Sequence, residues 1–158
     1  MSDERALLRH TLATLAYRGG KAVRGAPASF ADYRCGDSSR TPGQILAHIG
    51  DLMDWGLSIA EGQQKWHDAK PLAWEEECDR FFAALRNFDD YLASEKPLQV
   101  SAEQLFQGPI ADALTHVGQI AMLRRMSGAP LKGENYFVAE ITVGRVGPAQ
   151  PPPKKEFD

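Results

Sequence analysis

IADALTHVGQIAMLRRMSGAP, residues 110–130, has the apolar spacing of a single helix that ends at Gly128. Asp112 and His116 are four residues apart on a stripe beside the apolar one, so both side chains lie on the same side of this helix. The segment therefore predicts an amphipathic helix that carries two polar groups able to act together. The apolar stripe consists of Ile110, Leu114, Val117 and Ala121.

Three earlier segments show the same helical period. Residues 3–18 place leucines on one face, and we expect this helix to end at Gly19-Gly20. Thr41-Pro42 supplies an N-cap hydroxyl and a proline at the first helical position, and the pattern continues to about Gly62. A third helix is predicted from about Ala73 to Ser94, with three glutamates favourably placed in its first turn.

Four amphipathic helices in 158 residues predict an all-α protein, a four-helix bundle with a long first connection (residues 21–40) and an extended C-terminal tail. We expect one domain over residues 1–158, with the bundle at about 3–130. Residues 131–150 are expected to pack on the helices because they are rich in apolar side chains, and residues 151–158 to be mobile. The apolar side chains of this tail are Tyr136, Phe137, Val138, Ile141 and Val143.

Composition restricts the class of protein. The chain is 43% hydrophobic and 25% charged, as in globular domains, and its net charge of −3 gives no electrostatic reason to bind nucleic acid. No signal peptide is recognisable, and no run approaches the roughly eighteen apolar residues of a membrane span. We expect a cytoplasmic protein with no membrane partner. Cys35 and Cys78 belong to no C-x-x-C pair, so we expect two reduced cysteines, partly or wholly buried, without a metal or redox motif.

Two predicted helices carry candidate metal ligands. Asp112, His116 and Gln119 share one stripe, and His48 lies at the edge of the apolar arc of its helix. If these helices pack together, His48 can meet Asp112 and His116, whose spacing allows both to hold one ion. Spacing alone also fits a solvated ion pair and an ordinary core or surface histidine.

Other candidates are weaker. His10 lies off the apolar face of its helix and His67 lies in a loop, so both are predicted to be surface residues. The tryptophans, Trp55, Trp66 and Trp74, either line an apolar pocket or pack in the core. No serine has a histidine and an acid suggested as partners, and the catalytic residues remain unassigned.

Two stretches together resemble the paired signatures of the DinB/YfiT-like superfamily of metal-dependent four-helix-bundle proteins. These are RTPGQILAHIGDLM at 40–53 and HVGQIAMLRRMSG at 116–128. The resemblance covers about residues 3–130, and GENYFVAEITVGRVG at 133–147 is similar to an extension found in part of that family.

The resemblance implies a metal site. The family's three histidines, one on the second helix and two on the fourth, correspond to His48, Asp112 and His116, so an aspartate replaces the middle histidine. Two imidazoles and a carboxylate suit a divalent zinc, nickel, iron or manganese ion. Gln119 and Asp51 are candidates for orienting the two histidines.

The resemblance also implies a reaction class. Its members include bacillithiol-type thiol transferases and a mycothiol-dependent maleylpyruvate isomerase. We therefore expect a metal-dependent transferase or hydrolase that activates a low-molecular-weight thiol or water, in the first case toward a small electrophile. The alternative is a non-catalytic ligand-binding or stress-associated helical module. Relatives of this type are often dimers, so a two-fold homodimer is expected.

Overall fold

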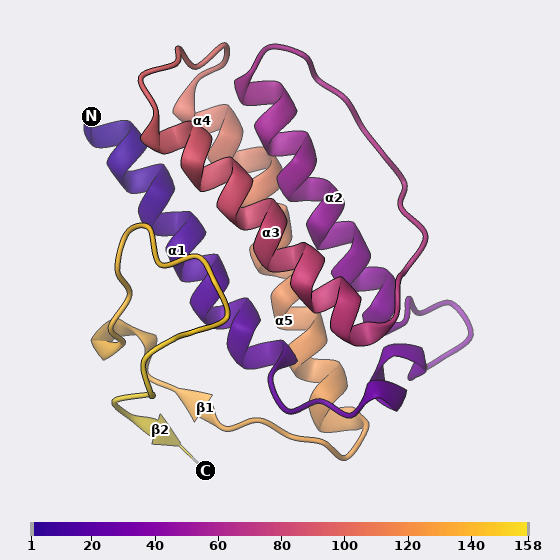
Figure 1. The fold of residues 1–158 in the computed structure, drawn as a ribbon. Coiled ribbons are helices and arrows are strands. Elements are labelled where there is room, and N and C mark those ends of the chain that lie inside the picture. Colours follow the sequence, from indigo (N-terminus) through magenta and orange to yellow (C-terminus); the bar gives the residue numbers. More distant parts are fainter. Residues whose placement is uncertain (1, 158) are drawn as a thin grey trace.

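The computed structural model describes residues 2–157, which are mostly helical (Figure 1). This confirms the all-α prediction, since only two strands of two residues occur among the described residues. Met1 and Asp158, the ends of the predicted domain, lie outside the described residues. The elements in chain order are α1 (Asp3–Val23), the 3₁₀ turn η1 (Ala28–Asp32), α2 (Pro42–Ala60), α3 (Trp74–Ala93), α4 (Ala102–Leu105), the π turn η2 (Phe106–Ile110), α5 (Ala111–Met126), β1 (Gly133–Glu134), the 3₁₀ turn η3 (Tyr136–Val138) and β2 (Glu156–Phe157).

The four long helices pack in a ring. α1 contacts α3 and α5, and α2 contacts the same two helices. In Figure 1, α1 and α5 run in one direction while α2 and α3 run in the other. The first connection, residues 24–41, is long, but the segment that crosses the length of the molecule is residues 61–73, which return along α2 to the start of α3. α2 and α3 are therefore parallel neighbours.

The prediction that the first helix ends at Gly19-Gly20 is wrong, because α1 continues to Val23. Both glycines are buried inside the helix, and neither has a positive φ. A Cβ atom built on Gly19 would lie 2.6 Å from Cζ of Phe81 in α3. Gly19 therefore serves the close approach of two helices and does not end one.

The last long helix begins earlier than predicted. Ser101 caps α4 in a capping box with Gln104, and helical backbone then continues through the π turn into α5. Pro109, which has no backbone N–H, lies inside this wider turn. The buried face also differs from the predicted stripe, since Leu114 and Ala121 are only half-buried. The residues of α5 that are buried are Ala113, Val117, Ile120, Leu123 and Arg124.

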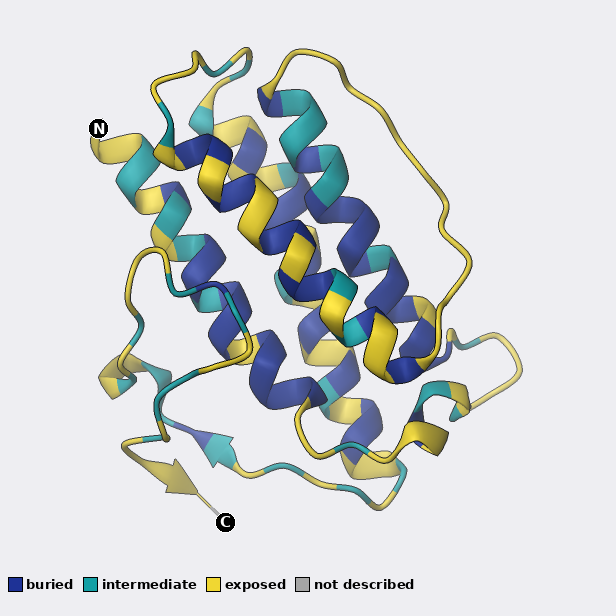
Figure 2. Ribbon diagram, in the orientation of Figure 1, coloured by how far each residue is buried: buried dark blue, intermediate teal, exposed yellow. Residues whose placement is uncertain are grey.

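The core lies between the facing sides of the helices, where buried residues follow the helical period (Figure 2). This apolar interior is large enough to hold the helices together without an ion at the surface. No helix among residues 2–157 is both long and apolar enough to cross a membrane. The largest fully buried side chains are Phe81, Phe88, Leu12, Leu15, Leu46, Ile49, Met53, Leu85, Leu92, Leu105, Ile110 and Ile120.

The C-terminal tail packs beside α1. Lys21 donates to Glu134 at 2.7 Å and to Glu156 at 2.9 Å, and the Tyr17 hydroxyl donates to Glu134 at 2.5 Å. Glu134 and Glu156 pair in the two-stranded antiparallel sheet. We predicted that residues 151–158 are mobile. In the structure, Glu156 and Phe157 form β2, and Glu156 pairs with Lys21 of α1. Lys21 is distant in the sequence, so no local pattern reveals this contact.

Candidate metal site

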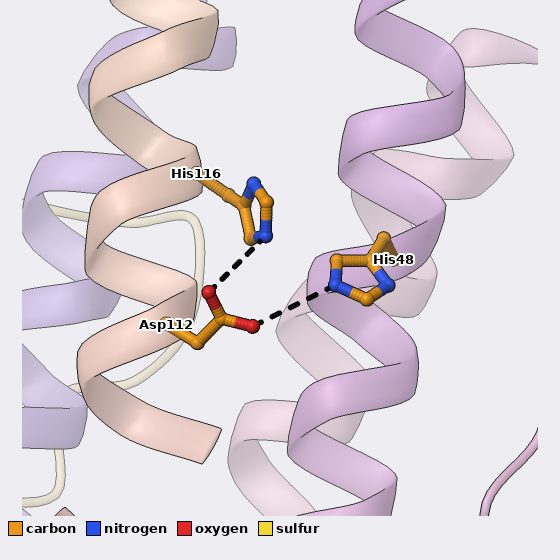
Figure 3. Close-up of side chains that lie close together, drawn as sticks. All are labelled: His48, Asp112 and His116. Atoms are coloured by element: carbon orange, nitrogen blue, oxygen red, sulfur yellow. Dashed lines mark ion pairs between the residues drawn. The ribbon is translucent and has the colours of Figure 1, made fainter. Parts of the chain in front are cut away.

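The three predicted ligands converge between α2 and α5 (Figure 3). His48 projects from α2, and Asp112 and His116 project from successive turns of α5, with the carboxylate between the two rings. Nε2 of His48 lies 3.7 Å from Oδ2 of Asp112, and Nε2 of His116 lies 3.3 Å from Oδ1. One donor atom from each residue lies within 4.8 Å of the other two, so the group can hold one metal ion.

Close helix packing brings the ligands together. A Cβ atom on Gly56 of α2 would lie 2.8 Å from Phe88 and 3.2 Å from Cβ of Pro109, so only glycine lets α2 approach the π turn so closely. The π turn ends at Ile110, directly before the turn of α5 that carries Asp112. Gly56 and the π turn therefore fix the start of α5 against α2.

The site is partly open to solvent. The exposed fractions of the side chains are 20% for His48, 14% for His116 and 48% for Asp112. Burial lowers the pKa of His48 most, and the neighbouring His116 and Arg40 side chains lower it further, against the opposing effects of Asp112 and Asp51. His48 therefore favours the uncharged imidazole, which is the form that binds metals.

Gln119 fixes the orientation of His116. Its side-chain oxygen lies 2.8 Å from Nδ1 of His116, and an amide oxygen can only accept, so Nδ1 carries the proton. In the uncharged ring, Nε2 then turns a lone pair toward a carboxylate oxygen of Asp112. Two facing lone pairs require a cation or a proton between them, and a divalent ion satisfies this requirement.

Asp51 does not take the predicted role. Its carboxylate accepts from Arg80 of α3 at 2.5 Å and from the backbone N–H of Ala69 at 3.0 Å, and it makes no hydrogen bond to His48. Arg80 also pairs with Glu77 and Asp54. Asp51 thus holds the return segment, residues 61–73, against α2.

One tryptophan of the return segment covers part of the site. The Trp66 ring centroid lies 5.5 Å from that of His48 and 5.8 Å from that of Trp55, both in edge-to-face geometry. Trp74 instead packs in the core against Phe30. The position of Trp66 could not be predicted from periodicity, because Trp66 lies in an irregular segment.

His10 and His67 are exposed, as predicted, and neither belongs to the ligand group.

A pocket of about 610 Å³ adjoins the two histidines. Arg40 and Cys35 line it from the first connection. The sequence offered no sign of the role of Arg40, and the prediction that Cys35 is buried is wrong, because its side chain is exposed. Met122 and Met126 line the pocket from α5. Helical periodicity could have predicted their position beside the site, because they continue the stripe of His116 and Gln119.

Three protein donors would leave coordination positions of a bound ion free. The pocket beside the rings provides room for a substrate there. Comparisons of this chain with protein-family models, curated proteins and solved structures found no match.

Proposed function

We propose that this protein binds one divalent metal ion through His48, Asp112 and His116 and uses it as a DinB-like, metal-dependent transferase or hydrolase. The observation that carries the proposal is the convergence of the three donor groups from two helices. The hydrogen bond between Gln119 and Nδ1 of His116 supports it, because Nε2, the ring nitrogen beside Asp112, is then the one available to an ion.

The spacing of the donors fits a metal ion. Ligand bonds of about 2.0–2.2 Å at tetrahedral angles separate neighbouring ligand atoms by about 3.4 Å. Nε2 of His116 lies 3.3 Å from Oδ1 of Asp112 and Nε2 of His48 lies 3.7 Å from Oδ2, and one donor atom of each residue lies within 4.8 Å of the other two. An ion would therefore require only small side-chain rotations.

The residues also restrict the choice of ion. Imidazole and carboxylate donors without a thiolate suit zinc, nickel, ferrous iron and manganese. Cys35 lines the neighbouring pocket but does not belong to the ligand group.

Two further features support membership of the DinB/YfiT-like superfamily. The ring of contacts among α1, α3, α2 and α5 supports a four-helix bundle. The order of the ligands along the chain, one on α2 followed by two on α5, supports the resemblance of the two signature stretches.

In the proposed reaction, a bound divalent ion supplies Lewis acidity and lowers the pKa of a low-molecular-weight thiol or of water. Gln119 holds His116 in the tautomer that presents Nε2. Trp66 shields one side of His48 from solvent, while the pocket on the other side admits the second reactant.

The first test is metal analysis of protein purified without a nickel column. We expect close to one divalent ion per chain, lost in His116→Ala and Asp112→Ala. Circular dichroism of these variants should be unchanged, because the apolar core does not include the site. His10→Ala, which alters an exposed histidine outside the group, is the matched control and should keep the metal. Equal metal content in His116→Ala and His10→Ala would disprove the site.

The second test separates an enzyme from a binding module. Metal-loaded protein is assayed with cysteine or glutathione and a chromogenic electrophile, and separately with an activated ester. Turnover that disappears in Asp112→Ala supports catalysis. Metal binding without turnover of either substrate would favour the non-catalytic module.

A further inference from the structure

The pocket beside the metal ligands has one apolar wall. Ile45 of α2 and Met122, Leu123 and Met126 of α5 form this wall, next to both histidine rings. Met122 and Met126 are more than half exposed, at 57% and 53%, although most large apolar side chains of the helices are buried. Flexible methionine side chains adapt to the shape of an apolar ligand. The wall therefore fits the apolar body of a small molecule.

The same pocket is also lined by one positively charged side chain. Arg40 lines the pocket directly before the N-cap of α2, and no acidic residue lines it. Within residues 2–157, no carboxylate lies within ion-pair distance of Arg40, and its side chain makes no hydrogen bond. A guanidinium without a protein partner favours an anion, and its planar donors match a carboxylate.

The two acids that border a second hollow together with Arg40 have other partners. Asp51 and Asp68 line a smaller hollow of about 280 Å³ that Arg40 also borders. Asp51 is held by Arg80, and Asp68 accepts from the indole N–H of Trp66 at 3.0 Å. Arg40 therefore remains available to a ligand in the larger pocket.

We propose that this pocket binds a small organic acid, with its carboxylate on Arg40, its apolar body against Met122 and Met126, and its reacting end toward the two histidines. This proposal names a substrate class for the proposed function, and the acid is a substrate only if that function is correct. Binding of the acid itself requires no metal ion.

The first experiment uses Cys35 as a reporter, because it is exposed and lines the same pocket. Iodoacetate and iodoacetamide both alkylate a thiolate: sulfur attacks the methylene carbon, a C–S bond forms and iodide leaves. They are similar in size, but only iodoacetate carries a negative charge. Both rates are proportional to the fraction of Cys35 present as thiolate, so this fraction drops out of the ratio of the two rates. The ratio therefore reports the electrostatic potential at Cys35. Peptide mass spectrometry assigns the alkylated cysteine.

We expect Arg40→Gln to reduce the ratio of iodoacetate to iodoacetamide rates by about threefold at low ionic strength, the effect of one unit charge at roughly 7 Å in water. Added salt should reduce this difference. Arg125→Gln, which removes an exposed arginine of α5 outside the pocket, is the matched control and should keep the wild-type ratio. An unchanged ratio in Arg40→Gln, or a Cys35 that neither reagent reaches, would overturn the proposal.

The second experiment measures binding with phenylacetate and its neutral analogue phenylacetamide. Phenylacetate should protect Cys35 from iodoacetamide in wild-type protein, and Arg40→Gln should weaken this protection about tenfold, as for loss of a charge-assisted hydrogen-bonded pair. Phenylacetamide should protect weakly and equally in both proteins. Equal protection by phenylacetate in wild type and Arg40→Gln would contradict the assignment.

Both proteins are tested after EDTA treatment and again after loading with zinc. One outcome is that phenylacetate protects EDTA-treated wild type but not EDTA-treated Arg40→Gln, and that neither protein binds zinc. This outcome would support the acid pocket and disprove the proposed metal function. Metal binding without phenylacetate protection would overturn the acid pocket and leave the metal proposal standing. Protection found only in zinc-loaded protein and unaffected by Arg40→Gln would place the carboxylate on the metal and overturn the role of Arg40.

Discussion

Replacing Gly19 and Gly20 separately by alanine should have opposite effects on stability. Both residues lie inside α1, where glycine is about 1 kcal/mol less favourable than alanine. A Cβ on Gly20 finds ordinary contact distance, 3.5 Å from Phe82. A Cβ on Gly19 would lie 2.6 Å from Phe81, whose ring is fully buried and cannot move aside. Gly20→Ala should therefore stabilise the fold, and Gly19→Ala should destabilise it.

The difference between the two variants isolates the steric effect, because the change in helix propensity is the same in both. Overpacking of a filled core costs about 1–3 kcal/mol. We therefore expect Gly19→Ala to be less stable than Gly20→Ala by about 2 kcal/mol, which corresponds to a difference in Tm of roughly 4–8 °C for a domain of this size.

Urea unfolding followed by circular dichroism at 222 nm measures this difference, with unchanged m values showing that the folded and unfolded states are comparable. Equal stability of the two variants would refute the close contact of α1 with α3. Destabilisation by both substitutions would instead indicate that α1 ends at these glycines.

Four further predictions concern the thiols, the tail, the site and the assembly. At pH 8, an aromatic disulfide reagent should titrate Cys35 in the native protein but not Cys78, because burial raises the pKa of Cys78 to about 11; rapid reaction of both thiols would contradict this. Lys21→Met should lower the free energy of unfolding by about 3 kcal/mol, because it leaves the buried Glu134 carboxylate without its cation. The Lys21 pKa is raised, so this stabilisation is complete below the unfolded pKa of lysine and is lost as pH rises through the folded pKa, where urea titrations of wild type and variant should converge. Nickel should quench the fluorescence of Trp66 beside His48, and Trp66→Phe should lose most of this quenching; quenching that persists in the variant would place the ion elsewhere. We also expect a two-fold dimer, which sedimentation equilibrium at micromolar concentration tests, and a monomer over the whole range would contradict it.

Local chemistry predicted the start of α2 well. The start of α2 follows from Thr41-Pro42, because the cap bonds form within four residues of sequence, and the capping box is present. Local sequence predicted that the first helix ends at Gly19-Gly20. This prediction failed because the role of Gly19 depends on Phe81 of another helix. The π turn that contains Pro109 likewise depends on packing against α2 and was not predicted.

The same distinction applies to the site. The convergence of His48, Asp112 and His116 could be predicted because they lie on regular helices, whose period fixes the direction of each side chain. Their role as metal ligands was predicted from the family resemblance, since spacing alone fits an ion pair equally well. Arg40 was not predictable because an irregular connection places it. Asp51 lies one turn from His48 on α2, but Arg80 of α3 provides a stronger, charged partner.

The parallel arrangement of α2 and α3 has a consequence for folding kinetics. Because residues 61–73 return along α2, these two helices cannot form as a local hairpin, and their contacts close a long stretch of chain. The ligands on α2 and α5 are separated further still, so we expect the site to assemble after the transition state. An ion bound there would then slow unfolding and leave the rate of folding unchanged.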